Sequence, residues 1–481
     1  MPSCPVSCSP PTRLPADQPR ERGVSRVTLW RRTARVWRLT ARNGIRYAIH
    51  RVHRLAKRDE RRRDELDAQF AIRTSQDVAR ELGDMKGAMM KFGQLLSFIV
   101  EALPDDAQRA LATLQADAKP MSPALVEQVI VEELGRPPEH VFLDWNRVPV
   151  AAASVGQVHR AVTHAGDDVA VKVQYPGVAE AIDSDLDNVE AFYRLGTAFV
   201  LKGLDANGLV DELRSRMREE LDYEREARNQ TEFHEHFSGH PFIAIPSVDP
   251  ATSTRRVLTS AWVDGMSWAE FESSADHAAR QRAGESIWRF AQHGVHRLGA
   301  FNGDPHPGNY MFSSHGDVTF IDFGLVKRWT PGEWELLAPS LDAIVVHRDP
   351  ERVVAEMETI GFLRPGHGLD PQAVYDYVST PYLPYLTDTF TFTREFNRDA
   401  MATIIDVNGP HAAVIEKLNM PPSFVILDRV VWGVSAILGR LQVTAPWRAM
   451  LLEYRDGGPP ATPLGEAEQA WLAARAASKL P

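Results

Sequence analysis

The feature that most constrains the fold of this chain is the run FNGDPHPGNYMFSSHGDVTFIDFG, which places Asp304, Asn309 and Asp322 within 18 residues of one another. Two prolines and a glycine soon after Asp304 exclude a helix and predict a stiff loop. The apolar residues just before Asp322 predict a short buried strand. The run therefore predicts a loop and a strand that present oxygen-bearing side chains. Phosphoryl transfer needs such side chains as a carboxylate near the nucleophile and as ligands for magnesium.

The spacing of these residues matches the protein-kinase pattern. In that pattern a catalytic Asp precedes a metal-binding Asn by five positions, and a second metal-binding Asp opens an Asp-Phe-Gly. We predict that Asp304 is the catalytic carboxylate and that Asn309 and Asp322 bind Mg²⁺. The alternative is a surface turn followed by a strand that ends in a chance Asp-Phe-Gly, which the joint register of the three residues disfavours.

A lysine upstream lies at the end of the apolar run Val169-Ala170-Val171-Lys172. Because side chains alternate along a strand, Val169, Val171 and Val173 should share one face and Lys172 the other. We predict that Lys172 binds the α- and β-phosphates of ATP or ADP. The alternative is an edge-strand lysine that points at water.

Two further segments are predicted to contact the nucleotide. A small-residue loop stands where protein kinases have a glycine-rich one, and alanine disfavours positive φ, so this loop should hold phosphates differently. Its predicted contact residues are Ala151, Ala152, Ala153, Ser154, Val155 and Gly156. The stretch Arg256–Gly265 predicts a last N-lobe strand and a hinge, whose backbone should meet adenine near Ser260 and Trp262. A strand that ends in a plain turn is the alternative.

Together these motifs resemble the UbiB/AarF (ADCK) family of atypical protein-kinase-like proteins. Lys91–Gln94 is similar to the family's K-x-G-Q motif, and the alanine loop is similar to its nucleotide loop. Glu220–Asp222 resembles its E-x-D region, and Gly303–Asn309 resembles its catalytic loop. The resemblance covers residues 80–440, and the combination is more specific than any single kinase motif.

The resemblance implies an α+β, two-lobed protein-kinase-like fold with an N-terminal helical extension that carries the K-x-G-Q motif. It also implies that Glu226 pairs with Lys172 and that Lys91 reaches the active site toward the E-x-D pair, as catalytic residues beside Asp304. The extension would cover the surface where a protein kinase docks a peptide. One departure is Asn302, where many members have His; that position supports the loop rather than the chemistry.

The segment after the Asp-Phe-Gly argues separately against a peptide substrate. Only Leu325–Trp329 precede Thr330-Pro331-Gly332-Glu333, which predicts a capping box with proline at the first helical position. That leaves no long activation loop and no Ala-Pro-Glu segment to seat a peptide. We expect the phosphoryl acceptor to be a small molecule, a lipid or water.

We predict six parts along the chain. They are a disordered start (1–22), a basic amphipathic helical arm (23–64), a helical K-x-G-Q extension (65–120), a kinase-like N-lobe with a helical insertion (121–264), a kinase-like C-lobe (265–450) and a C-terminal tail (451–481).

The predicted arm is strongly basic in an acidic chain. Residues 20–58 hold thirteen Lys and Arg against one acidic residue, Glu21, while the net charge of the whole chain is −10. Apolar residues recur there every three or four positions, which predicts an amphipathic helix that lies on an anionic membrane surface. Packing on the acidic body of the chain is an equal alternative, and a transit peptide is a weaker one. Nucleic acid is not expected as a partner, because no reader motif accompanies the charge.

The rest of the composition favours a reducing compartment. The two cysteines, Cys4 and Cys8, lie in the Pro/Ser-rich start, so no disulfide framework is predicted. The longest candidate span, Val430–Leu438, is too short to cross a bilayer. We therefore predict a cytoplasmic protein without a transmembrane span, peripheral on the membrane if the arm binds it. The sequence carries no signal of oligomeric state.

The leading hypothesis for function is an ATP- and Mg²⁺-dependent UbiB-type atypical kinase or ATPase. The resemblance implies that it acts in, or regulates, isoprenoid quinone or membrane-lipid metabolism, with a lipid or quinone precursor as partner. One alternative is a regulator that binds ATP or ADP without turnover. Another is a small-molecule phosphotransferase of the aminoglycoside or choline kinase type, which would not be expected to carry the K-x-G-Q motif or the alanine loop.

Overall fold

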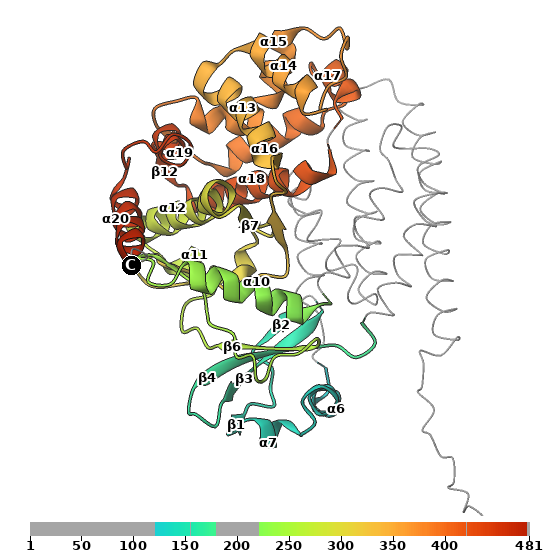
Figure 1. Ribbon diagram of the computed structural model, residues 1–481, viewed down its shortest axis with the longest axis vertical. Coiled ribbons are helices and arrows are strands. Elements are labelled where there is room, and N and C mark those ends of the chain that lie inside the picture. The colour runs from blue at the N-terminus through green and yellow to red at the C-terminus, as the bar shows by residue number, and fades with distance from the viewer. Residues whose placement is uncertain (1–120, 154, 179–220, 420, 479–481) are drawn as a thin grey trace, which may run out of the picture.

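The computed structural model describes residues 121–153, 155–178, 221–419 and 421–478. In Figure 1 these residues form a small lobe built on an antiparallel sheet and a larger, mainly helical lobe, with α10 lying between them. The α+β, kinase-like fold predicted from the motifs is confirmed. The predicted disordered start, basic arm, K-x-G-Q extension and helical insertion lie outside the described residues.

The N-lobe is a five-stranded antiparallel sheet with the order β1-β3-β4-β6. The short strands β1 and β2 both pair with β3, along the edge that β4 leaves open. The strands are β1 (Asp144–Trp145), β2 (Ala151–Ala153), β3 (Gly156–Val162), β4 (Asp168–Gln174) and β6 (Val257–Ala261).

One face of this sheet is apolar and is covered by α6 (Pro123–Leu134), with α7 (Pro138–Val141) beside it. Val171 and Val173 are fully buried against Val129 and Ile130 of α6. Lys172 leaves the opposite face, so the predicted alternation along β4 is confirmed. The polar side of the sheet therefore faces the rest of the molecule.

Helix α10 (Tyr223–His236) crosses between the lobes. Asp222 caps its N-terminus, because its side chain accepts a hydrogen bond from the backbone N–H of Arg225 at 2.9 Å. The helix buries Glu226 and Asn229 toward the active site, and Phe233 in the C-lobe core. It is thus the element that joins the polar face of the sheet to the catalytic segments.

The C-lobe is organised around α12 (His277–His293) and α18 (Pro422–Leu441), which lie against each other. Side chains from both fill its core, including Trp288, Ile437 and Leu438. The other helices are α11 (Trp268–Ser274), α13 (Glu333–Asp342), α14 (Pro350–Thr359), α15 (Pro371–Val378), α16 (Arg394–Ile405), α17 (Ala412–Lys417), α19 (Trp447–Arg455) and α20 (Pro463–Ser478), with shorter turns at Gly294–Leu298, Pro307–Asn309, Ala343–His347 and Thr380–Tyr385.

Three small sheets lie at the junction of the lobes or within the C-lobe. They pair β7 (Ala300–Asn302) with β10 (Val326–Arg328), β9 (Val318–Phe320) with both β8 (Tyr310–Phe312) and β5 (Ile243–Ala244), and β11 (Phe390–Thr391) with β12 (Thr444–Ala445). The predicted strand before Asp322 is β9. The pairing of β7 with β10 holds the segments on either side of the catalytic loop and the Asp-Phe-Gly together.

Two local predictions differ from the structure. The helix after the Asp-Phe-Gly begins at Glu333, with Gly332 as its N-cap, so the predicted proline at the first helical position is wrong. Of the predicted capping box, one contact is present, because the Glu333 carboxylate accepts from the backbone N–H of Thr330 at 2.8 Å. Gly332 has φ 83°, which ends the preceding turn in a conformation that glycine adopts readily. The chain also continues as α19 across residue 450, so the helix runs through the predicted boundary between the C-lobe and the tail.

In the part of the chain that the structure describes, no helix is both long and apolar enough to cross a membrane. Val430–Leu438 belongs to α18, which lies inside the C-lobe.

Candidate active site

Lys172 lies between two carboxylates that come from different elements. Its Nζ is 2.9 Å from Oε1 of Glu226 on α10 and 3.2 Å from Oδ2 of Asp322, which follows β9. The register of the sheet sets this geometry, because Lys172 lies opposite Val158 of β3 and Leu258 of β6 on the face away from α6. The ion pair with Glu226 is the one that the family resemblance implied.

The three charged groups at this point are one cation and two carboxylates, largely shielded from solvent. The side chain of Glu226 is 3% exposed, and that of Lys172 is 16% exposed. Burial alone would lower the pKa of Lys172, but the carboxylates of Asp322 and Glu226 raise it well above its ordinary value. Lys172 is therefore a permanent cation, and Asp322, 29% exposed, is the more accessible of its two partners.

The catalytic loop places Asp304 and Asn309 against each other. Nδ2 of Asn309 donates to the backbone oxygen of Asp304 at 3.0 Å and to its Oδ2 at 3.1 Å. The turn Pro307–Asn309 forms this contact, as the prolines of the run predicted. With Nδ2 engaged in this way, Oδ1 is the atom of the Asn309 amide that could bind a metal ion.

Asn302 connects the catalytic loop to the Asp-Phe-Gly. Its Nδ2 donates to the backbone oxygen of Asp322 at 2.7 Å, and its Oδ1 accepts from the backbone N–H of Asp304 at 2.9 Å. The backbone N–H of Ile321 also donates to the backbone oxygen of Asn309 at 3.0 Å. Asp304, Asn309 and Asp322 are thus held in one constellation, with Asn302 as a support.

The Asp-Phe-Gly is further held by α10. Asn229 donates to the backbone oxygen of Phe323, and Arg225 donates to that of Gly324, both at 2.9 Å. The backbone N–H of Gly324 donates to Oδ1 of Asp322 at 3.1 Å. These contacts leave Asp322 between the two halves of the site, with Lys172 on one side and the catalytic loop on the other.

Arg429 is a site residue that the sequence reasoning missed. It comes from α18, and its Nη2 forms an ion pair with Oδ1 of Asp304. The two residues are 125 positions apart, and Arg429 belongs to no motif that we recognised, so no signal in the sequence pointed to it. It places a cation directly beside the proposed catalytic carboxylate.

The alanine loop is a hairpin rather than an irregular loop. Ala151, Ala152 and Ala153 form β2, and they pair with Val158, Gln157 and Gly156 of β3. Gly156 is needed because a Cβ there would lie 2.2 Å from the backbone oxygen of Val173. Ser154 lies outside the described residues.

Val155, next in this hairpin, has its side chain buried in an apolar cluster with Leu221, Tyr223 and Leu258. Its backbone oxygen accepts from the backbone N–H of Tyr175 at 2.9 Å. A phosphate contact from Val155 would therefore have to come from its backbone N–H. Ala151 and Ala152 of β2 are exposed, and they lie in the same hairpin as Val155, at the edge of the sheet.

The predicted hinge begins at the end of β6. Ser260 lies opposite Ala170, on the same face of the sheet as Lys172. The backbone N–H of Trp262 donates to the backbone oxygen of Asp168 at 2.9 Å, so an adenine contact from Trp262 would have to use its carbonyl. Beyond the hinge, Met266 exchanges backbone hydrogen bonds with Phe312 of β8 at 2.8 and 2.9 Å. These bonds join the segment after the hinge to the hairpin of β8 and β9, which lies between Asn309 and Asp322.

Lys91 is another predicted site residue that lies outside the described residues, and so does Glu220.

Comparison with known proteins gives consistent results. The family model of the ABC1 atypical kinase-like domain matches residues 113–357. The chain is 33% identical over 321 residues to the protein ACTIVITY OF BC1 COMPLEX KINASE 1, chloroplastic, of Arabidopsis thaliana, covering 64% of this chain and 45% of that protein. It is 29% identical over 301 residues to the atypical kinase COQ8, mitochondrial, of Saccharomyces cerevisiae, covering 62% of this chain and 59% of that protein. The chain thus spans about half the length of these curated relatives.

Among solved structures, the chain is similar to Rv3197 from Mycobacterium tuberculosis, determined in complex with erythromycin. The TM-score is 0.60 at 31% sequence identity, and the match covers 81% of this chain and 97% of Rv3197.

Proposed function

The chain belongs to the ABC1 atypical kinase-like family, which is the UbiB/AarF (ADCK) family, and on that premise we propose that it binds ATP with Mg²⁺ and transfers or hydrolyses the γ-phosphate. The observation that carries this proposal is the position of Lys172, paired with Glu226 and with the Asp of the Asp-Phe-Gly. In protein kinases this arrangement of Lys, Glu and Asp accompanies a competent nucleotide site.

Each residue has one role in the proposed reaction. Lys172 binds the α- and β-phosphates, and Glu226 holds Lys172 in place. Asp304 orients the nucleophile and accepts its proton. Asn302 supports both Asp304 and Asp322 without touching the substrate. The oxygen of the nucleophile forms a bond to the γ-phosphorus as the bond between that phosphorus and the bridging oxygen of ADP breaks.

The side chains present fit a magnesium ion. Asn309 and Asp322 offer an amide and a carboxylate oxygen, which are hard ligands. Within the described residues no group of three or more His, Cys, Asp or Glu could hold a metal. That suits Mg²⁺, which usually takes one or two protein ligands and completes its shell with phosphate oxygens and water. The ion would neutralise charge on the β- and γ-phosphates.

The acceptor in this proposal is a small molecule, a lipid or water. Support comes from the short stretch after the Asp-Phe-Gly, where β10 and then α13 follow within nine residues of Gly324 and leave no long loop to seat a peptide. We include in the proposal the role that the motif resemblance implies, in isoprenoid quinone or membrane-lipid metabolism at a membrane surface. Cytoplasmic placement stays a prediction.

The test is Mg²⁺-dependent ATP hydrolysis by the full chain, with and without anionic liposomes. We expect Asp304→Asn to lower turnover by roughly 10²- to 10⁴-fold, which is the range for loss of a general base. Lys172→Ala should weaken nucleotide binding as well as turnover, because it removes the phosphate ligand.

A matched control is Lys327→Ala. Lys327 is also 16% exposed and ion-paired, but its partner is Glu333. Turnover that is equal in the wild type and in both site variants would refute the proposed site. Mg²⁺-dependent nucleotide binding without any turnover would favour the alternative of a regulator that senses ATP or ADP.

A further inference from the structure

A cavity of about 420 Å³ adjoins Asp304 on the C-lobe side. It lies among α11, the catalytic loop, α16 and α18. Volumes of this size are typical of sites for small organic ligands. The cavity opens at the carboxylate where, in the proposed function, the nucleophile must lie.

The walls of this acceptor cavity are mainly apolar. Met401, Trp432 and Ile437 are at most 5% exposed, and Gly433 and Ala436 add small surfaces from the same helix. Gly433 lets α18 approach the catalytic loop, because a Cβ there would lie 2.4 Å from Cγ of Pro305. A ligand with many hydroxyl groups would leave them without partners on such walls, and each would cost free energy.

The polar groups of the acceptor cavity are unevenly satisfied. At the far end Arg440 is neutralised by Glu272, with Nε to Oε1 at 2.9 Å and Nη2 to Oε2 at 2.5 Å. At the Asp304 end, Nη2 of Arg429 forms an ion pair with Asp304. Nη1 of Arg429 and Oδ1 of Asn397 have no hydrogen-bond partner among the described residues, but both atoms are buried away from the open volume of the cavity. A buried donor on a charged group that stays unsatisfied costs about 1–3 kcal/mol or more.

The apolar walls and the carboxylate of Asp304 at one end point to a ligand with a hydroxyl group and an apolar body. We propose, on the basis of the function proposed above, that the acceptor cavity binds the phosphoryl acceptor and that this acceptor is an aliphatic alcohol. Its hydroxyl lies at the carboxylate of Asp304, and its chain packs on Met401, Trp432 and Ile437.

The proposed step is balanced. The alcohol oxygen forms a bond to the γ-phosphorus of ATP while the bond from that phosphorus to the bridging oxygen breaks, and ADP leaves with the electron pair. Asp304 takes the hydroxyl proton and later releases it to water. The products are an alkyl phosphate, ADP and a proton.

The experiment uses the full chain, Mg-ATP and 1-octanol as the probe, with octane as the matched compound that lacks a hydroxyl. Octyl phosphate is measured by mass spectrometry, and ATP hydrolysis without octanol is measured in parallel. Ala436→Leu adds three carbons to the cavity from a helix position where leucine is well tolerated. Ala402→Leu is the matched control, since Ala402 is exposed on α16.

We expect octyl phosphate from the wild type and from Ala402→Leu. Ala436→Leu should form octyl phosphate at least about tenfold more slowly. The reason is that one methylene too many or too few in an apolar pocket changes kcat/KM by about 10- to 200-fold. The hydrolysis of ATP by this variant without octanol is the reference rate, and the formation of octyl phosphate should fall by a larger factor than this rate does.

Two results would overturn the inference while leaving the proposed function in place. One is ATP hydrolysis by the wild type with no octyl phosphate. The other is octyl phosphate formed by Ala436→Leu at the wild-type rate. The absence of Mg²⁺-dependent nucleotide binding and turnover in the wild type would instead overturn the proposed function, and this inference with it.

Discussion

At the scale of single residues, the geometry of the site depends on a few polar side chains that form hydrogen bonds to the backbone of the catalytic segments. Asn302 is the clearest case, because its amide binds the backbone of Asp304 and that of Asp322 at the same time. From the sequence, this residue was only a departure from the histidine that the family resemblance places there. In the structure it couples the catalytic loop to Asp322 of the Asp-Phe-Gly.

We therefore predict that Asn302→Ala lowers the turnover of ATP by up to about 100-fold, since a displacement near 1 Å at a catalytic group can cost that much. Asn302→His should lose less, because an imidazole can replace part of the contact. Steady-state kinetics at saturating Mg-ATP would measure both.

Asn419→Ala is a suitable control for Asn302→Ala. Asn419 also donates from Nδ2 to a backbone oxygen, that of Gly361 at 3.1 Å, but it is exposed and far along the chain from the catalytic loop. If Asn302→Ala turned over ATP as fast as Asn419→Ala, the supporting role of Asn302 would be wrong.

At the scale of elements, α18 contributes side chains to two different cavities of the C-lobe. On one side it brings Arg429 to Asp304 and Gly433 to Pro305. On the other side Asp428 faces an apolar pocket lined by residues such as Tyr377, Tyr382 and Trp432. The helix is apolar around most of its circumference because it is enclosed by other helices, which is the usual reason for such a pattern in a globular lobe.

Burial on that second side raises the pKa of Asp428 to about 6, against a smaller opposing effect of its hydrogen bond to Trp432. A carboxyl whose pKa is higher in the folded state binds its proton more tightly there. Folding stability should therefore fall as pH rises from about 4 to 6, with the full cost present above pH 6. Asp428→Asn should stabilise the protein at pH 8 by up to about 3 kcal/mol and leave it unchanged near pH 4.

Urea unfolding of the wild type and Asp428→Asn at pH 4 and pH 8 would check this prediction. The control is Asp399→Asn on α16, where the carboxylate is 71% exposed and should show little effect at either pH. A gain for Asp428→Asn that is the same size at both values of pH would contradict the titration argument.

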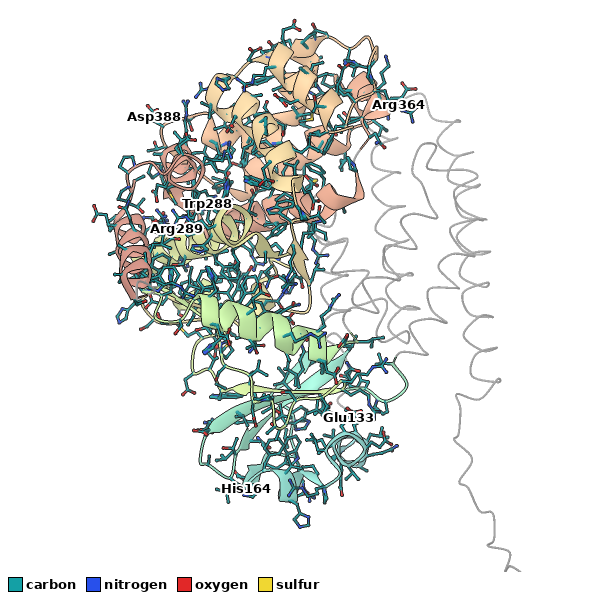
Figure 2. All side chains as sticks on the ribbon, viewed as in Figure 1. Glu133, His164, Trp288, Arg289, Arg364 and Asp388 are labelled. Carbon is teal, nitrogen blue, oxygen red and sulfur yellow. The ribbon has the colours of Figure 1, made fainter. Side chains whose placement is uncertain are left out.

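At the scale of the whole molecule, the last helix is joined to the C-lobe by a buried ionic cluster. Figure 2 labels Arg289 beside Trp288 on α12, and the Arg289 side chain is fully buried. Its guanidinium binds Glu453 of α19 at 2.8 Å and Glu468 of α20 at 3.2 Å. Glu468 also accepts from Nδ1 of His293 at 2.7 Å and from the Tyr454 hydroxyl at 2.5 Å. The segment that we predicted as a tail is thus packed into the C-lobe.

Breaking this cluster should be costly. Glu468→Gln removes the charge that pairs with Arg289, and breaking a buried pair typically costs about 3–5 kcal/mol. Although burial alone would raise the pKa of Glu468, the hydrogen bond and charge of His293, with help from Tyr454 and Arg289, lower it to about 2. The stabilisation is therefore complete above pH 4.5 and is lost as pH falls toward 2.

Thermal unfolding at pH 7 and pH 3 would test this, and Glu466→Gln is the control because Glu466 is exposed on the same helix. Glu468→Gln should have a much lower Tm than Glu466→Gln at pH 7, and a smaller deficit at pH 3. An equal Tm for the two variants at pH 7 would show that the cluster does not stabilise the lobe.

The sequence by itself determined the parts of this protein that depend on neighbouring residues. Prolines and spacing predicted the loop from Asp304 to Asn309 and the strand before Asp322, and the period of two placed Lys172 opposite the valines of β4. Backbone dihedrals and side-chain periodicity act within a few residues, so such local patterns can be recognised without the fold. The kinase-like architecture followed from their resemblance to a family.

Only the tertiary structure decided the contacts that join distant segments. Helix α13 begins at Glu333 because Gly332 before it adopts a left-handed backbone conformation. The sequence Thr330-Pro331-Gly332-Glu333 does not determine whether Gly332 takes that conformation or a helical one. The ion pair of Arg429 with Asp304 joins residues 125 apart, and that of Arg289 with Glu468 joins residues 179 apart. Such pairs form only where packing brings two helices or a helix and a loop together and removes them from water, and nothing in the local sequence carries that information.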